Sequence, residues 1–290
     1  MAGVREGVRE IVLTFSCQDA QGIVAAVASL FAQRGFNIRE SSQFEDTSRR
    51  RFFMRTVFEC PAGYELPAIR DLFRPVAEHY DMDWDLFDVD CKPKVLIAVS
   101  QWGHCLNGLL NNWKNGSLPI DIVGVVSNHE VMRDLTEWYQ LPFHYLPVTA
   151  DTKAEQEARI WALMEDSGAE CLVLARYMQI LSDDLCRKLS GRAINIHHSF
   201  LPGFKGARPY HQAYERGVKL IGATAHYVTA DLDEGPIIEQ SVERVSHVNL
   251  PEEMAEIGRD IEAVVLNRAV RWHAEHRVLL NGSKTVVFAR

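Results

Sequence analysis

The chain has 290 residues, of which 47% are apolar, and a formal net charge of −8 at pH 7. This length suits two globular domains, and the negative charge argues against a nucleic-acid-binding surface. The longest apolar run, 11 residues from Gly22 to Ala32, is too short to cross a bilayer. The charged N-terminus lacks the apolar stretch of a signal peptide, and the six cysteines show no metal-ligand or disulfide spacing. We therefore expect a cytoplasmic protein with reduced thiols, no metal site, and neither nucleic acid nor a membrane as partner.

The first 90 residues predict a small α/β domain. Apolar residues alternate with more polar ones over 11–16, as in a half-buried strand. After a polar turn at 18–22, apolar residues recur with helical spacing until Gly35 ends the helix. The residues that share this helical face are Val24, Val27, Ala28 and Phe31.

The pattern after this helix completes the order βαββαβ. That order suits a ferredoxin-like antiparallel sheet with both helices on one face. The remaining elements are strands near 36–45, 51–59 and 82–88 and a helix near 66–79. A linker at 90–94 follows, because Pro93 cannot donate to a strand ladder and biases Lys92 away from helix. We therefore assign 1–90 and 91–290 to separate domains.

Beyond the linker, short apolar strands alternate with helices, which predicts a doubly wound, mostly parallel sheet. Two later strands flank the loop that holds Asp233, and a long helix near 252–275 closes the domain. The expected strands are 94–100, 121–127, 142–148, 170–175, 193–198, 221–229 and 236–245, and the expected helices are 103–114, 129–139, 153–167 and 182–188.

Asn195 and His197 occupy alternate positions of one predicted strand, so their side chains point to the same face. Asn195 offers an amide donor, and His197 an imidazole that can carry charge near neutral pH. Asp233 follows on a loop that Gly235 ends. The three supply an oxyanion donor, a proton shuttle and an orienting carboxylate. The alternative is a hydrogen-bonded core histidine and a solvated turn.

Longer motifs resemble the folate-dependent formyltransferase family, and within it the deformylase branch most of all. They are NIHHSFLPGFKGARPYHQAYERGVKLIGATAHYVTADLDEGPIIEQ, LARYMQIL, HCLNGLL and VVSNH, which together span about residues 94–245. The catalytic asparagine, first histidine and aspartate of the family match Asn195, His197 and Asp233. The resemblance therefore implies that these three residues are catalytic.

Members of this family bind a 10-formyl folate and differ in what receives the formyl group. Transformylases of glycinamide ribonucleotide hold the phosphate of their acceptor in a loop of small residues after the first strand. Trp102, His104 and Cys105 occupy that place here, and no basic extension suited to tRNA follows. Water is then the simplest acceptor. The resemblance implies a hydrolase that converts 10-formyltetrahydrofolate, its substrate, to formate and tetrahydrofolate with no permanently bound cofactor.

Such hydrolysis would supply formate for purine synthesis and balance the one-carbon pool. The alternative is a transferase that passes the formyl group to a small amine. One assay separates the two, because only the hydrolase releases formate when no amine is added.

The resemblance places the folate on the loop at 176–181 and under the loop at 226–233. The candidate substrate-binding residues in these loops are Met178, Gln179, Ile180, Leu181, Val228, Thr229 and Ala230. The alternative is that Met178, Ile180 and Leu181 are core residues. His104 either lines the formyl site or caps the helix that starts there, and we place it in the site. His198 is expected to point to the opposite face from His197 and to support the structure.

The motif D-x-x-G-I-V and the run Gly35-Phe36-Asn37-Ile38 resemble the ACT domain, a family of small regulatory modules, over about 8–90. Gln21 departs from the family, which often has proline there. The resemblance implies an amino-acid effector, glycine or methionine, and a homo-oligomer that pairs through this domain. The expected effector pocket consists of Asp19, Gly22, Ile23, Asn37 and Ile38. The alternative is an ACT fold that binds no ligand and serves assembly alone.

Overall fold

The computed structural model describes residues 8–61, 63–203 and 209–289, and the chain divides into two compact units. The first unit contains residues 8–92, 275–281 and 286–289, and the second contains 93–274 and 282–285. None of the helices in the described part of the chain combines the length and apolarity that a bilayer crossing requires.

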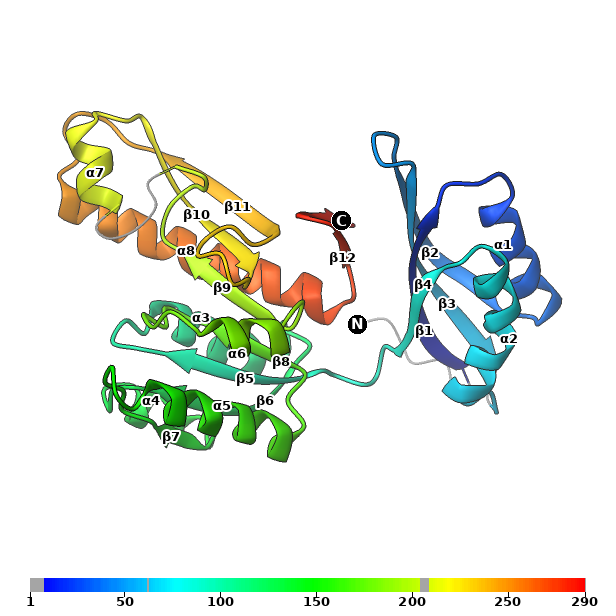
Figure 1. The fold of residues 1–290 in the computed structure, drawn as a ribbon, viewed down its shortest axis with the longest axis horizontal. Coiled ribbons are helices and arrows are strands. Elements are labelled where there is room, and N and C mark those ends of the chain that lie inside the picture. Colours follow the sequence, from blue (N-terminus) through cyan, green and yellow to red (C-terminus); the bar gives the residue numbers. More distant parts are fainter. Residues whose placement is uncertain (1–7, 62, 204–208, 290) are drawn as a thin grey trace. The chain divides into compact units, whose positions relative to one another are not determined.

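The first unit is a four-stranded antiparallel sheet with the strand order β2-β3-β1-β4, which confirms the predicted βαββαβ fold (Figure 1). Both helices pack on the same core, which is rich in phenylalanine because Phe15, Phe31, Phe58 and Phe73 all point into it. The elements are β1 (Val8–Gln18), α1 (Ile23–Gln33), β2 (Asn37–Asp46), β3 (Arg51–Pro61), α2 (Leu66–His79) and β4 (Asp83–Asp88).

The buried face of α1 shares Val27 and Phe31 with the predicted face but begins at Ile23 instead of Val24. Ile23, Val27 and Phe31 are its buried residues, whereas Val24 is 40% exposed. The spacing i, i+4, i+8 fits one face of a helix as well as the predicted spacing does. The sequence pattern alone therefore does not say which of the two faces packs against the sheet.

The C-terminal segment differs from the expectation that 91–290 forms one domain, because residues 275–281 and 286–289 group with the first unit. Arg277 is 3% exposed, and its Nη1 donates to Glu40 Oε1 at 3.0 Å and to the Phe288 carbonyl at 2.9 Å. Arg55 on β3 donates to the Glu275 carbonyl at 3.0 Å. Buried arginines of this kind need partners, and the C-terminal segment and β2 supply them.

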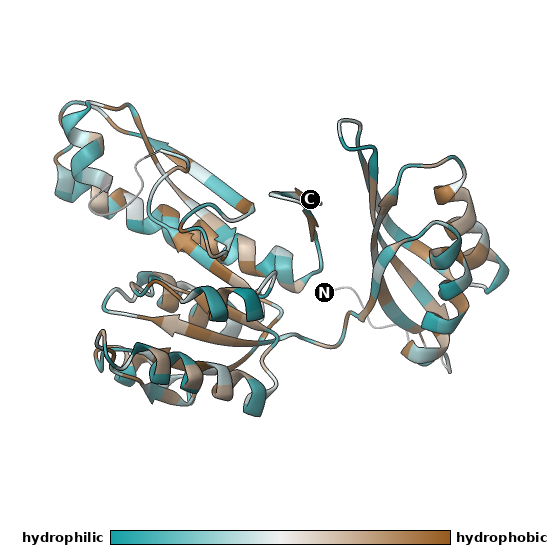
Figure 2. Ribbon diagram, in the orientation of Figure 1, coloured by the Kyte–Doolittle hydropathy of each residue, from teal (hydrophilic) through white to brown (hydrophobic). Residues whose placement is uncertain are grey.

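The second unit is a seven-stranded sheet with the order β11-β10-β9-β8-β5-β6-β7, whose strands are parallel except for β10 (Figure 1). Figure 2 shows hydrophobic residues concentrated on its central strands. β8 is buried along its whole length, which explains why its sequence is continuously apolar rather than alternating. The sheet confirms the predicted mostly parallel fold.

The elements from β5 to α8 follow the predicted order, with one addition. The short helix α7 was not expected. The bounds are β5 (Lys94–Val99), α3 (His104–Lys114), β6 (Asp121–Ser127), α4 (Arg133–Trp138), β7 (Phe143–Tyr145), α5 (Lys153–Ser167), β8 (Cys171–Leu174), α6 (Asp183–Lys188), β9 (Ala193–His197), α7 (Pro209–Glu215), β10 (Leu220–Tyr227), β11 (Ile237–Arg244) and α8 (Pro251–Ala274). Beyond α8 lie β12 (Val278–Asn281) and β13 (Lys284–Val287).

Candidate active site

A cavity of about 620 Å³ lies within the second unit, at the carboxyl ends of β8 and β9. Ligands of open α/β sheets bind in the crevice outside the carboxyl ends of the strands, which is this edge. The cavity also receives residues from the end of β10 and the loop after it, and from α3, α7 and α8.

The structure brings Asn195, His197 and Asp233 together on the wall of this cavity. His197 Nδ1 lies 3.2 Å from Asp233 Oδ1, and the two side chains are 6% and 9% exposed. His197 Nε2 is buried and has no partner among the described protein atoms. One ring nitrogen is thus held by the carboxylate, and the other is left for a ligand.

His226 is a further member of this group that the sequence analysis did not identify. It stands opposite Asn195 in the pairing of β10 with β9, and its Nε2 lies 3.2 Å from Asn195 Nδ2. Its Nδ1 lies 2.9 Å from the Tyr227 carbonyl oxygen, which can only accept. The proton therefore sits on Nδ1, and Nε2 accepts from the Asn195 amide. Only the register of β9 against β10 reveals this contact.

The electrostatics of the group keep Asp233 charged and His198 neutral. Burial alone would raise the pKa of Asp233, but the hydrogen bond and the charge of His197, together with His226, outweigh it and leave that pKa below its usual range. Burial, assisted by Arg176 and His197, lowers the pKa of His198 to about 4. Burial likewise lowers the pKa of His226.

These shifts predict that the protein loses stability as the pH falls from about 6.5 to about 4. In that window the unfolded chain protonates His198 and the folded chain does not, so folding becomes less favourable by about 1.4 kcal/mol per pH unit for that group. Denaturant unfolding at pH 7 and pH 5 measures the effect. The variant His198→Gln should show a shallower slope, and an equal slope would contradict the assignment.

A second polar group surrounds the buried carboxylate of Glu262, which is 1% exposed. His104 Nε2 lies 2.7 Å from Glu262 Oε2, Tyr210 donates to Oε1 at 2.8 Å, and Arg176 Nε lies 3.4 Å from Oε2. The sequence predicted His104 at the site and Arg176 as part of the folate loop 176–181, but it did not predict Glu262 or Tyr210. A glutamate on the otherwise apolar buried face of α8 was the available signal.

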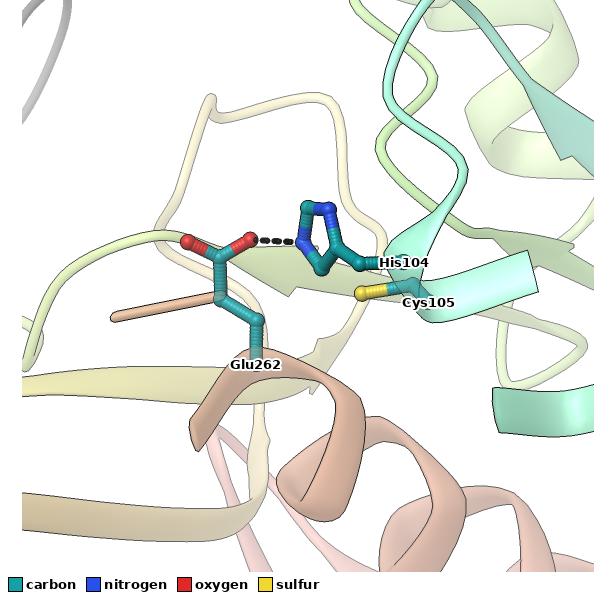
Figure 3. Close-up of side chains that lie close together, drawn as sticks. All are labelled: His104, Cys105 and Glu262. Carbon is teal, nitrogen blue, oxygen red and sulfur yellow. Dashed lines mark hydrogen bonds and ion pairs between the residues drawn. The ribbon is translucent and has the colours of Figure 1, made fainter. Parts of the chain in front are cut away.

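Glu262, His104 and Cys105 are also close enough to suggest a metal site, since their ligand atoms lie within 4.8 Å of one another (Figure 3). The donor set does not suit a cation. Burial raises the pKa of the Cys105 thiol well above its usual range, so no thiolate is offered. The guanidinium of Arg176 lies 3.4 Å from the same carboxylate oxygen, and its positive charge repels a cation. Two hydrogen bonds and an ion pair satisfy Glu262 without a metal.

All of the residues predicted to bind folate line the cavity: His104, Met178, Gln179, Ile180, Leu181, Val228, Thr229 and Ala230. Met178 is 54% exposed and Ile180 is 60% exposed, so neither is a core residue. Leu181, at 8% exposure, packs in the core while it borders the cavity. His104 does not cap α3. The N-cap residue of this helix is Gly103, and there is no capping hydrogen bond from a side chain.

The expectation for His198 was wrong. β9 ends at His197, so the alternation of faces does not extend to the next residue. His198 lines the same cavity, with its ring 5.1 Å from that of His197 and 6.3 Å from that of Tyr210. It lies between the group of Asn195, His197 and Asp233 and the Glu262 group.

The predicted effector residues in the first unit lie at the start of α1 and along β2. Gly22 adopts φ +94° at the N-cap of α1, which accounts for glycine there. Asn37 Nδ2 donates to Glu59 Oε2 at 3.1 Å, and Ile38 is 37% exposed. Ile23 is 2% exposed and packs in the core, so its side chain serves the fold. Asp19 is exposed.

Comparisons with known proteins place the chain in a family. A formyl transferase family model matches residues 93–270, and an ACT domain model matches residues 11–66. The chain is 51% identical over 277 residues to a formyltetrahydrofolate deformylase from Corynebacterium sp. (strain P-1), covering 95% of this chain and 97% of the relative. The chain belongs to the formyltetrahydrofolate deformylase family.

Solved structures support the same placement. The crystal structure of formyltetrahydrofolate deformylase from Burkholderia mallei ATCC 23344 matches with a TM-score of 0.92 and 54% identity, over 97% of this chain and 100% of that one. A glycinamide ribonucleotide transformylase 1 from Symbiobacterium toebii matches with a TM-score of 0.64 and 25% identity, over 68% of this chain and 95% of that one. The deformylase match thus covers more of this chain than the transformylase match does.

Proposed function

We propose that the cavity of the second unit hydrolyses 10-formyltetrahydrofolate to formate and tetrahydrofolate. The observation that carries this proposal is the meeting of Asn195, His197 and Asp233 on one cavity wall, in a chain of the deformylase family. In the reaction, a water oxygen bonds to the formyl carbon, the bond from that carbon to N10 breaks, and N10 takes up a proton.

Asn195 and His197 are proposed to stabilise the oxyanion that forms on the formyl oxygen. An amide carries two N–H groups, and His226 takes one of those of Asn195, which leaves the other for the substrate. His197 donates through Nε2, the nitrogen without a protein partner. Asp233 holds Nδ1 of the same ring and orients the attacking water.

The folate is proposed to lie between the segments 178–181 and 228–230. Exposed apolar side chains at Met178 and Ile180 offer a surface on which a flat pterin can pack. Such side chains on a cavity wall are costly to leave in water and gain free energy when a ligand covers them.

Formate release without any added amine tests the proposed function. We expect steady turnover of 10-formyltetrahydrofolate on water alone, with one formate per tetrahydrofolate formed. Turnover that appears only when a small amine is supplied would favour formyl transfer instead.

The ACT-like first unit is proposed to bind an amino acid, glycine or methionine, and to pair with a second copy of the chain. The turn 19–22 leads into α1, whose free N–H groups favour a carboxylate. Asn37, now bonded to Glu59, would add its side-chain carbonyl for the ammonium group.

Calorimetry on the intact chain tests the effector. We expect glycine or methionine to bind and to change turnover, and Gly22→Val to abolish both effects, because a β-branched residue is strained at φ +94°. If neither amino acid binds, the first unit serves assembly alone.

A further inference from the structure

Glu262 anchors a wall of the cavity that the proposed catalytic residues do not use. Its carboxylate comes from α8 and meets side chains from three other segments: His104 at the start of α3, Tyr210 on α7 and Arg176 after β8. Figure 3 shows the His104 ring facing the Glu262 carboxylate. Burial alone would raise the pKa of Glu262, but the hydrogen bond from His104 and the charge of Arg176 outweigh it, so the carboxylate stays charged.

The carboxylate determines where the His104 ring carries its proton. An ionised carboxylate can only accept hydrogen bonds, so His104 Nε2, at 2.7 Å, must donate. In the neutral ring Nδ1 then carries the lone pair and is an acceptor. This Nδ1 is buried and has no hydrogen-bond partner among the described protein atoms, and the same holds for Arg176 Nε and Nη1, both donors. One acceptor and two donors thus remain unused on the Glu262 side of the cavity.

Water can satisfy atoms of both kinds, since a water molecule can donate and can accept. An amine that is protonated at neutral pH cannot accept from Arg176 and is repelled by its charge. The negative charge of Glu262 is already paired with Arg176 and its oxygens accept from His104 and Tyr210, so less of that charge is left to draw such an amine. The chemistry of this wall therefore favours water over an amine.

We infer that Glu262, acting through His104 and Arg176, positions the attacking water and makes water the formyl acceptor. This inference rests on the proposed hydrolysis. Glu262 and Arg176 are positioning residues, and His104 is the group that holds the water through Nδ1. Asp233 lines the same cavity and acts on that water from the catalytic group.

The first test compares Glu262→Gln with Asp260→Asn, a matched change at an exposed carboxylate on the same helix. A glutamine amide cannot accept from both His104 and Tyr210 with the strength of a carboxylate. We expect Glu262→Gln to lower kcat for formate release by about tenfold or more, with the KM for folate within about twofold. Asp260→Asn should leave both unchanged. An unchanged kcat in Glu262→Gln would overturn the inference, as would a loss that appears only as a higher KM.

The second test follows where the formyl group goes when hydroxylamine is added. The nitrogen of hydroxylamine attacks the formyl carbon, and the bond from that carbon to N10 breaks. The products are formohydroxamate and tetrahydrofolate. We expect His104→Ala to raise the share of formohydroxamate over formate by about tenfold, because the water loses its holder. His104→Gln, which retains a polar group, should lie between His104→Ala and the natural chain. An unchanged share in both variants would overturn the inference.

Measurements on the natural chain distinguish a failure of the proposed hydrolysis from a failure of the role assigned to Glu262 and His104. Failure of the natural chain to release formate would remove the proposed hydrolysis itself. Normal release by the natural chain, combined with normal kcat and partition in the variants, would remove only the role of Glu262 and His104. Melting temperatures of all variants show whether a loss of turnover is a loss of folding.

Discussion

His197→Ala is expected to lower kcat for formate release by a factor of about 10² to 10³, with little change in the KM for folate. The reason lies in the two ring nitrogens. Asp233 holds Nδ1 at 3.2 Å, and the buried Nε2 has no partner among the described protein atoms, so the ring is poised to donate to a developing oxyanion. Losing one such donor costs about 2.7–4 kcal/mol of transition-state stabilisation.

Steady-state kinetics of His197→Ala, Asp233→Asn and Asn195→Ala check this prediction. All three should lose kcat more than affinity, since each group acts on charge that exists only in the transition state. His247→Ala is the control, because His247 is exposed and does not line the cavity. Near-native kcat in Asp233→Asn would show that the carboxylate is not part of the mechanism.

Gly235→Ala is expected to destabilise the protein by about 3 kcal/mol and to lower kcat by about a hundredfold. A Cβ at this position would lie 1.7 Å from the Tyr227 carbonyl oxygen and 2.9 Å from its carbon. These are backbone atoms, so the strand or the loop has to shift. The same carbonyl accepts from His226 Nδ1, and His226 in turn orients Asn195. The shift would therefore reach Asp233 and Asn195 together.

Asp231→Ala provides the matched control for Gly235→Ala. Asp231 lies on the same loop, is exposed and does not line the cavity. Its replacement should leave the melting temperature and kcat close to those of the natural chain. A Gly235→Ala protein that melts and turns over normally would mean that the loop can absorb the added carbon.

The parts of this protein that local patterns govern could be predicted from the sequence. Alternating and helical spacings identified nearly all strands and helices, and Asn195 and His197 share a face because β9 is extended. Glu262 and His226 were missed because their roles depend on contacts between distant segments. The register of β9 against β10 sets the place of His226, and the packing of α8 beside α3 sets that of Glu262.

Short or irregular segments escaped prediction for a related reason. α7 is only one to two helical turns long. It follows residues 204–208, which lie outside the described part of the chain. β12 and β13 are four residues each, too short for alternation to stand out. His198 was placed on the wrong face because the strand ends one residue before it.

The grouping of residues 275–281 and 286–289 with the first unit makes that unit a discontinuous domain. A fragment that ends at Lys92 would keep Glu40 and Arg55 but lose Arg277 and Glu275, their partners. The complementary fragment would keep Arg277 and its bond to Glu275 but lose Glu40, its carboxylate partner on β2. Separating the two units therefore calls for a rearranged gene, in which the C-terminal segment is fused to the residues 8–92 with which it groups.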